Sequence, residues 1–77
     1  MSDLVPLQFL ASGESGHVHD VVGDAGAVGR LAEMGVRSGA AVTMVRQGSP
    51  CIIRLADGKY CMRDADTFHV LVQVAAV

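Results

Sequence analysis

The fold of this chain is decided by the stretch CIIRLADGKYCMR, residues 51–63. Two apolar runs flank an Asp-Gly pair at residues 57–58, and Asp-Gly is favoured in two-residue hairpin turns because both of its positions need positive φ. The stretch therefore predicts an antiparallel hairpin in which Leu55 and Tyr60 share the core face. The expected pairs are Ala56 with Lys59, Leu55 with Tyr60, Arg54 with Cys61, and Ile53 with Met62.

The two cysteines of the chain fall on opposite faces of this predicted hairpin. Cys51 lies on the core face and Cys61 on the other face, because side chains alternate along a strand. An internal disulfide is then excluded by geometry, and two cysteines that form no C-x-x-C pair do not make a disulfide framework. We expect two reduced thiols, with the buried Cys51 as inert packing.

Ahead of the hairpin, residues 25–34 carry the one helical pattern of the chain. Apolar side chains recur along this segment at spacings of four and three. Asp24 can cap its start, and Gly35 can supply the left-handed residue that ends it. A helix over 25–34 is therefore predicted.

Short Val- and Ile-rich runs between glycines predict the other strands. The five strands are expected at residues 17–22, 41–46, 51–55, 59–63 and 69–74. In the first of them Val18 and Val21 are three apart, which predicts a β-bulge near Asp20. Because short strands with open sheet edges risk aggregation, we predict closure into a barrel. The fold class is mostly β, a small five-stranded SH3-like barrel with one α-helix between the first and second strands.

Length and charge limit the function classes. Seventy-seven residues, of which 51% are hydrophobic, predict a single domain over 1–77 with its core at about 7–74. The net charge of -2, with Lys59 as the one lysine, gives no electrostatic source for nucleic-acid binding. No apolar run approaches the roughly 20 residues of a membrane span, and the first four residues lack the pattern of a signal peptide. We expect a cytoplasmic protein with no nucleic-acid partner and no direct membrane insertion.

Catalytic motifs do not emerge from the sequence. The serines near glycine, in 13–16 and 48–49, lack the G-x-S-x-G pattern of a nucleophile elbow. The glycines of 26–30 lack the G-K-[ST] ending of a phosphate-binding loop. Turn formation accounts for these residues, and the sequence predicts a protein that is not an enzyme.

Three histidines form the one candidate metal site. His17 and His19 are two apart in a predicted strand and so share a face, and pairing of the first and last strands would bring His69 near them. Such a set would bind a borderline divalent transition metal such as zinc or nickel, weakly, because exposed histidines lack orienting hydrogen bonds. The alternative is that all three are solvated residues of the outer face, and both interpretations stay open. No other cofactor is expected.

A longer pattern resembles a known family. Residues 30–40, RLAEMGVRSGA, are similar to the R-L-x-x-[LM]-G-[ILV]-x-x-G stretch of the FeoA family, small proteins of bacterial ferrous iron uptake. The L-x-x-L-x-x-G-x-x-G-x-V pattern over 7–18 and the segment from Pro50 to Val70 look like the opening and the end of the same family. Ser38 departs from the pattern where proline is usual, as does Cys61, where alanine is usual. The resemblance covers nearly the whole chain.

The resemblance implies an SH3-like barrel and an accessory or regulatory protein without catalysis. Its implied partner is the cytoplasmic GTP-binding part of the FeoB membrane transporter, which would recruit the chain to the inner membrane. The same domain closes some iron-dependent repressors. A transition-metal-binding or metal-sensing domain related to that C-terminal domain is therefore the alternative function, and a weak homo-oligomer is a further alternative.

The predicted helix and the turn after it form the candidate partner-binding surface. Arg30, Glu33 and Arg37 point away from the predicted core, and Met34 falls at its margin. Methionine is common at adaptable binding surfaces. We therefore expect these four residues to contact the partner.

Overall fold

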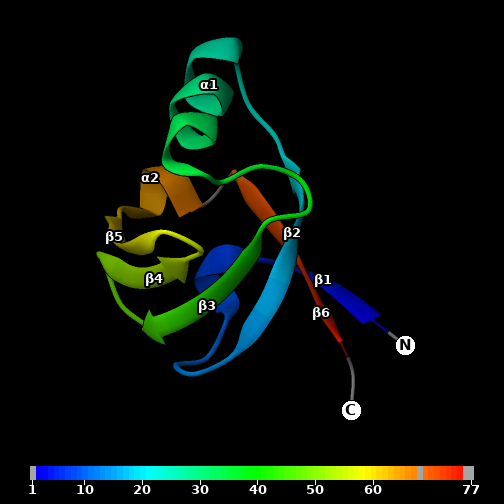
Figure 1. The fold of residues 1–77 in the computed structure, drawn as a ribbon, viewed down its shortest axis with the longest axis vertical. Helices are drawn as coiled ribbons and strands as arrows, with labels where there is room; N and C mark the ends of the chain where they lie inside the picture. The colour runs from blue at the N-terminus through cyan, green and yellow to red at the C-terminus, as the bar shows by residue number, and fades with distance from the viewer. Residues whose placement is uncertain (1, 68, 76–77) are drawn as a thin grey trace.

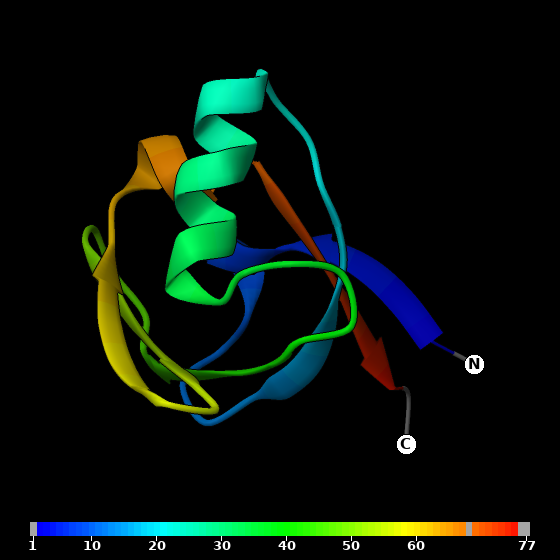
Figure 2. The same cartoon turned by 45° about the horizontal axis from the view of Figure 1, so that its top comes forward.

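The structure is a computed structural model that describes residues 2–67 and 69–75, and its architecture is mostly β. The strands are β1 (Ser2–Pro6), β2 (Ser15–Val21), β3 (Ala41–Arg46), β4 (Cys51–Leu55), β5 (Gly58–Met62) and β6 (Val70–Ala75). They form one sheet in the order β1-β6-β2-β3-β4-β5, in which every neighbouring pair is antiparallel. The sheet curls on itself, and α1 (Ala25–Met34) lies at one end of the molecule (Figures 1 and 2). The predicted mostly-β fold, with a helix between strands 15–21 and 41–46, is confirmed.

The sheet has one strand more than the five that were predicted. β1 pairs with β6 at the edge of the sheet, with Leu4 opposite Gln73 and Pro6 opposite Leu71. This strand ends at Pro6, which has no backbone N–H to donate. An edge strand tolerates proline because one of its two sides has no neighbouring strand that needs such a donor. β1 is also hard to recognise in the sequence, because no tight turn joins it to its partner. That partner is β6, which is far away along the chain.

The two outer strands of the sheet, β1 and β5, form no ladder with each other in the described residues. Short helical segments follow each of these two strands. η1, a 3-10 helix (Leu7–Phe9), follows β1 and contacts α2 (Asp64–Thr67), which follows β5. The buried hydroxyl of Thr67 donates a hydrogen bond to Gln8 Oε1 at 3.2 Å. The barrel is therefore completed by contacts between η1 and α2 rather than by a sixth pair of strands.

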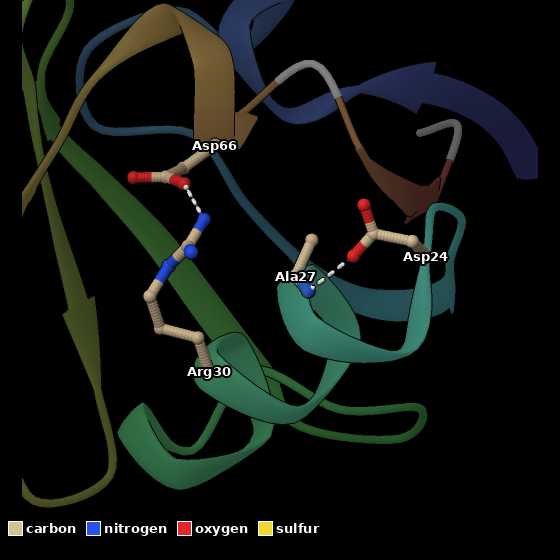
Figure 3. Close-up of polar contacts among 4 residues, drawn as sticks. All are labelled: Asp24, Ala27, Arg30 and Asp66. Atoms are coloured by element: carbon tan, nitrogen blue, oxygen red, sulfur yellow. Dashed lines mark hydrogen bonds and ion pairs between the residues drawn. The ribbon is translucent and has the colours of Figure 1, made fainter.

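The helix α1 has the predicted boundaries and caps. Asp24 Oδ1 accepts a hydrogen bond from the Ala27 N–H at 2.8 Å, as an N-cap does (Figure 3). Gly35 ends the helix with φ at 102°, and its N–H donates to the carbonyls of Leu31 and Ala32. Leu31 points into the core and is fully buried. Local capping thus fixes both ends of α1.

The hairpin of β4 and β5 forms, but the predicted register was wrong by two residues. Leu55 pairs with Gly58 instead of Tyr60, so the loop consists of Ala56 and Asp57. In the described residues only glycines have positive φ, and Gly58 is one of them, at 151°. Asp57 therefore does not adopt the conformation of the predicted turn. Two loop residues with negative φ followed by glycine fit a type I turn, which favours glycine at its fourth position.

The predicted core face of the hairpin is kept, because a shift of two residues does not exchange the faces of a strand. Ile53, Leu55 and Met62 are buried. Cys51 is buried and Cys61 is exposed, and both are free thiols, as expected.

The bulge predicted near Asp20 is confirmed. The register between β2 and β6 shifts between Val18 and Asp20, so His19 is the additional residue of β2. Asp20 Oδ1 accepts a hydrogen bond from the Val21 N–H at 2.9 Å. Ser38, which stands where the family pattern has proline, donates its hydroxyl to the His19 carbonyl at 3.2 Å. A proline at this position has no hydroxyl to make that contact.

One apolar core joins the sheet, η1 and α1. Its buried members are Leu7, Leu10, Val18, Leu31, Val36, Val42, Met44, Cys51, Ile53, Leu55, Met62, Val70 and Val72. Within residues 2–67 and 69–75, the buried side chains of this core are aliphatic, Met and Cys, and side chains of this kind must pack closely to fill a core.

Among the described glycines, Gly16 of β2 has the least room for a side chain. A Cβ atom there would lie 2.6 Å from Val72 Cγ1 and 2.7 Å from the Gln73 carbonyl oxygen. We expect Gly16→Ala to lower the free energy of unfolding by about 1–3 kcal/mol, since overpacking displaces the β6 backbone. Urea denaturation measures this change.

Gly29 in α1 provides the matched control, because a Cβ atom there meets nothing within 4 Å. Gly29→Ala should raise the free energy of unfolding by about 0.5–1 kcal/mol, the usual difference between Gly and Ala inside a helix. Equal, small effects of both substitutions would contradict the close contact between β2 and β6.

A second prediction concerns Tyr60, the one tyrosine of the chain. Its phenol donates a hydrogen bond to Asp57 Oδ1 at 3.0 Å, and this bond, with desolvation and the negative charge of Asp57, raises the pKa of Tyr60. Asp57→Asn should lower this pKa, because the neutral amide no longer opposes formation of the tyrosinate. Titration of tyrosinate absorbance measures the change, and Asp66→Asn is the control. An unchanged titration curve for Asp57→Asn would show that the contact is absent in solution.

Candidate functional site

The four residues predicted to bind a partner lie on α1 and the turn that follows it. Arg30, Glu33 and Arg37 are exposed, and Met34 is half-buried and packs against the core. We call these four residues the α1 surface. Its three charged side chains are exposed to solvent, and its methionine packs against the core. The surface therefore presents both positive and negative charges on a helix that is packed on the core.

Arg30 is held in place by α2. Its Nη2 lies 2.8 Å from Asp66 Oδ1, and the two side chains are 61% and 25% exposed (Figure 3). An ion pair this exposed contributes at most about 1 kcal/mol to stability. Its structural effect is to fix the direction of the Arg30 side chain across the gap between the two helices.

Arg37 stands between two hollows of the surface. One hollow, of about 150 Å³, lies between α1 and the bulge of β2, and the other, of about 330 Å³, lies between the α1–β3 turn and the β4–β5 loop. The second hollow is lined by Gly35, Ala40, Ala41 and Ala56, whose small side chains leave the space. Neither hollow was predicted from the sequence, although small residues beside Arg37, at positions 35, 40 and 41, were a signal for the larger one.

The three histidines lie at two separate places. His17 is exposed on β2 and pairs with Gln73, and His19 is exposed at the bulge. His69 lies beyond the end of that ladder, where its carbonyl accepts a hydrogen bond from the Val22 N–H at 2.8 Å. Its ring packs on Gly23, so close that a Cβ atom there would be 3.0 Å from Nδ1.

The neighbouring strands that the metal hypothesis required, β2 and β6, do pair. Their register brings His17 and His19 onto one strand but leaves His69 four positions along the chain from Gln73, the partner of His17. In residues 2–67 and 69–75 no three His, Cys, Asp or Glu side chains gather in a group that could hold a metal ion. The described side chains therefore do not fit a zinc site with three protein ligands.

A groove of about 450 Å³ on the outer face of β2 and β3 was not predicted. It is lined by Ser15, Gly16, His17, Ala41, Val42, Thr43 and Gln73. The hydroxyls of Ser15 and Thr43 lie 2.8 Å apart across the two strands and share a hydrogen bond. We call this feature the sheet groove. Among the described helices, none has the length and apolar character of a membrane span.

Solved structures with the same fold include proteins of iron uptake. An iron uptake regulatory protein (FeoA) is 24% identical with a TM-score of 0.88, covering 94% of this chain and 100% of that chain. A zinc-complexed FeoA of Stenotrophomonas maltophilia is 24% identical with a TM-score of 0.75, covering 94% of this chain and 88% of that chain. The latter is described as a prokaryotic SH3 domain protein and a candidate activating factor of bacterial ferrous iron transport. The predicted SH3-like fold is thereby confirmed.

The fold also occurs within larger metal-dependent regulators. A manganese-dependent transcriptional repressor is 10% identical with a TM-score of 0.88, covering 97% of this chain and 44% of that chain. At such identities the likeness shows the fold alone. No curated protein sequence is a significant match to the chain. The family model of the FeoA domain, however, matches residues 5–74, and the chain therefore belongs to the FeoA family.

Proposed function

We propose that this chain is a non-catalytic accessory protein of bacterial ferrous iron uptake that binds the cytoplasmic GTP-binding part of a FeoB-type transporter. The observation that carries the proposal is the FeoA family match over residues 5–74. The description of the Stenotrophomonas maltophilia relative as a candidate transport-activating factor supports it. The chain acts in the cytoplasm, and the transporter recruits it to the inner membrane.

The α1 surface is the proposed contact with the transporter. Glu33 and Arg37 are exposed and, within the described chain, make no side-chain hydrogen bond or ion pair, so both charges can meet a partner. Arg30 is already oriented by Asp66, which lowers the entropy lost when a partner binds it. The hollows on either side of Arg37 can receive projecting side chains of the partner.

The purified GTP-binding part of the transporter, titrated against this chain with and without a GTP analogue, tests the proposal. We expect a double variant Glu33→Lys, Arg37→Glu to bind roughly tenfold or more weakly, because reversed charges meet like charges of the partner. Both residues are exposed, so the unfolding midpoint should stay unchanged. Arg46→Glu on β3, a residue that is also exposed but lies outside α1 and the turn after it, is the control.

Two results would contradict this proposal at different levels. An absence of binding by the wild-type chain, with either nucleotide state, removes the transporter as the partner. Equal binding by wild type and the double variant keeps the partner but moves the contact away from the α1 surface. Met34 is less suitable as a probe, because it packs against the core and its replacement by Glu would disturb the fold as well.

A metal-binding or metal-sensing role is the second candidate function, and the zinc complex of the Stenotrophomonas maltophilia relative is the observation that favours it. His17 and His19 on β2 are the proposed ligands, with His69 at a separate place. Two exposed imidazoles without orienting partners bind zinc only weakly.

Calorimetric titration with zinc is expected to give weak binding that acid abolishes, because only the neutral imidazole binds a metal ion. His17→Ala should reduce the heat of binding, and His69→Ala should leave it unchanged. Equal heats of zinc binding for wild type and His17→Ala would show that these histidines are ordinary surface residues. An equal loss of binding heat in His17→Ala and His69→Ala would instead indicate that His17 and His69 bind one zinc ion together.

A further inference from the structure

Two cations face each other directly across β4 and β5. Arg54 pairs with Lys59, and both side chains are exposed on the outer face of the sheet. Like charges in this position destabilise a sheet. Neither side chain makes a hydrogen bond or ion pair with another described residue. The pair is thus an unneutralised positive site, in a chain whose net charge is -2.

This positive site continues into a row of hydroxyls. Arg54 pairs with Thr43 on its other side, and Thr43 pairs with Ser15, so all four side chains form one outer row across β2, β3, β4 and β5. Ser15 and Thr43 also line the sheet groove. The two cations therefore stand just beyond one side of the groove.

The opposite side of the groove carries an apolar residue. A second outer row runs from Ala41 through His17 and Gln73 to Leu4, and the Leu4 side chain is 51% exposed. The floor of the groove includes Ala41, which has only a methyl group, and the backbone of Gly16, which has no side chain. At Gly16 the packing of Val72 and Gln73 leaves no room for one.

We propose that the sheet groove binds an extended acidic segment of a partner protein, with one apolar side chain in the groove and carboxylates at Arg54 and Lys59. The charge of the cation pair selects an acidic occupant, since exposed cations facing a groove attract and orient anionic groups. This site lies on the sheet rather than on the α1 surface, so it stands whatever the outcome of the transporter experiment.

The spacing of the strands gives the pattern of the segment. Neighbouring strands lie about 4.8 Å apart, which puts Arg54 about 7 Å and Lys59 about 12 Å from the middle of the groove. Alternate side chains of an extended peptide are about 6.6 Å apart on one face. The matching sequence is an apolar residue followed by acidic residues two and four positions later.

Nuclear magnetic resonance titration of the full, ¹⁵N-labelled chain with the peptide Ser-Leu-Ser-Glu-Ser-Glu-Ser, blocked at both ends, tests the site. Amide signals of Ser15, Gly16, His17 and Thr43 should move, and binding should weaken as salt is added. A peptide with Gln in place of both Glu residues should bind roughly 2- to 30-fold more weakly, the range for two exposed charge pairs. A peptide with Ser in place of Leu should also bind more weakly.

Matched variants of the protein separate this site from general attraction to a cation. The double variant Arg54→Gln, Lys59→Gln should bind the Glu peptide about as weakly as the wild-type protein binds the Gln peptide. The control Arg46→Gln, Arg63→Gln removes the same charge from exposed residues outside the row. Ala41→Leu, which fills the exposed floor of the groove, should block the apolar side chain while the fold is kept.

Three outcomes would overturn the proposal. The first is equal binding of the Glu and Gln peptides. The second is an equal loss in the two double variants, which would mean unspecific attraction. The third is a set of shifted signals on α1 instead of β2 and β3.

Discussion

At Gly16, β2 passes so close to β6 that a Cβ atom would lie 2.6 Å from Val72 Cγ1 and 2.7 Å from a backbone oxygen. β2 pairs with β6 on one side and with β3 on the other, which joins the first and last parts of the sheet. Beyond Gly16, the bulge at His19 shifts the register between β2 and β6. Val18 and Val72, which pair across these two strands, are both members of the aliphatic core.

The outer surface of the sheet is low at the sheet groove. Gly16 faces inward and contributes only backbone to this surface, and Ala41 on β3 adds only a methyl group. The groove lies among the outward side chains of Ser15, His17 and Thr43. The α1 surface arises differently, from a capped helix whose Arg30 is tied to α2. The molecule thus carries two distinct features that can bind partners, one on a helix and one on the sheet.

The helix caps and the bulge were predicted correctly from the sequence, whereas the register of the hairpin was not. The caps at Asp24 and Gly35 act within a few residues, so both ends of α1 were predictable. The bulge was predictable because Val18 and Val21 are three residues apart, which breaks the two-residue alternation of a regular strand. The hairpin register was wrong because an Asp-Gly pair is compatible with more than one turn, and the choice depends on φ at Asp57.

Although β2 and β6 pair as the metal hypothesis required, other features that depend on exact pairing between distant segments could not be predicted from the sequence. β1 pairs with β6, which is distant along the chain, and its Pro6 is atypical of a strand, so the sequence did not indicate it. The position of His69 relative to His17 depends on the exact register between β2 and β6, which a bulge shifts. The sheet groove requires side chains from three strands, and no stretch of the sequence contains them together.

The position of β6 between β1 and β2 has a consequence for synthesis of the chain on the ribosome. Residues 70–75 are translated after every other strand, yet they supply the ladder partners of the two strands that are translated first. Until they emerge from the exit tunnel, β1 has no partner and β2 has one open edge, and such edges pair readily with other chains. Closing so long a loop is slow compared with forming α1 or the β4–β5 hairpin. The nascent chain therefore completes this sheet only once β6 has left the ribosome, and any stall before residue 70 leaves aggregation-prone strand edges exposed.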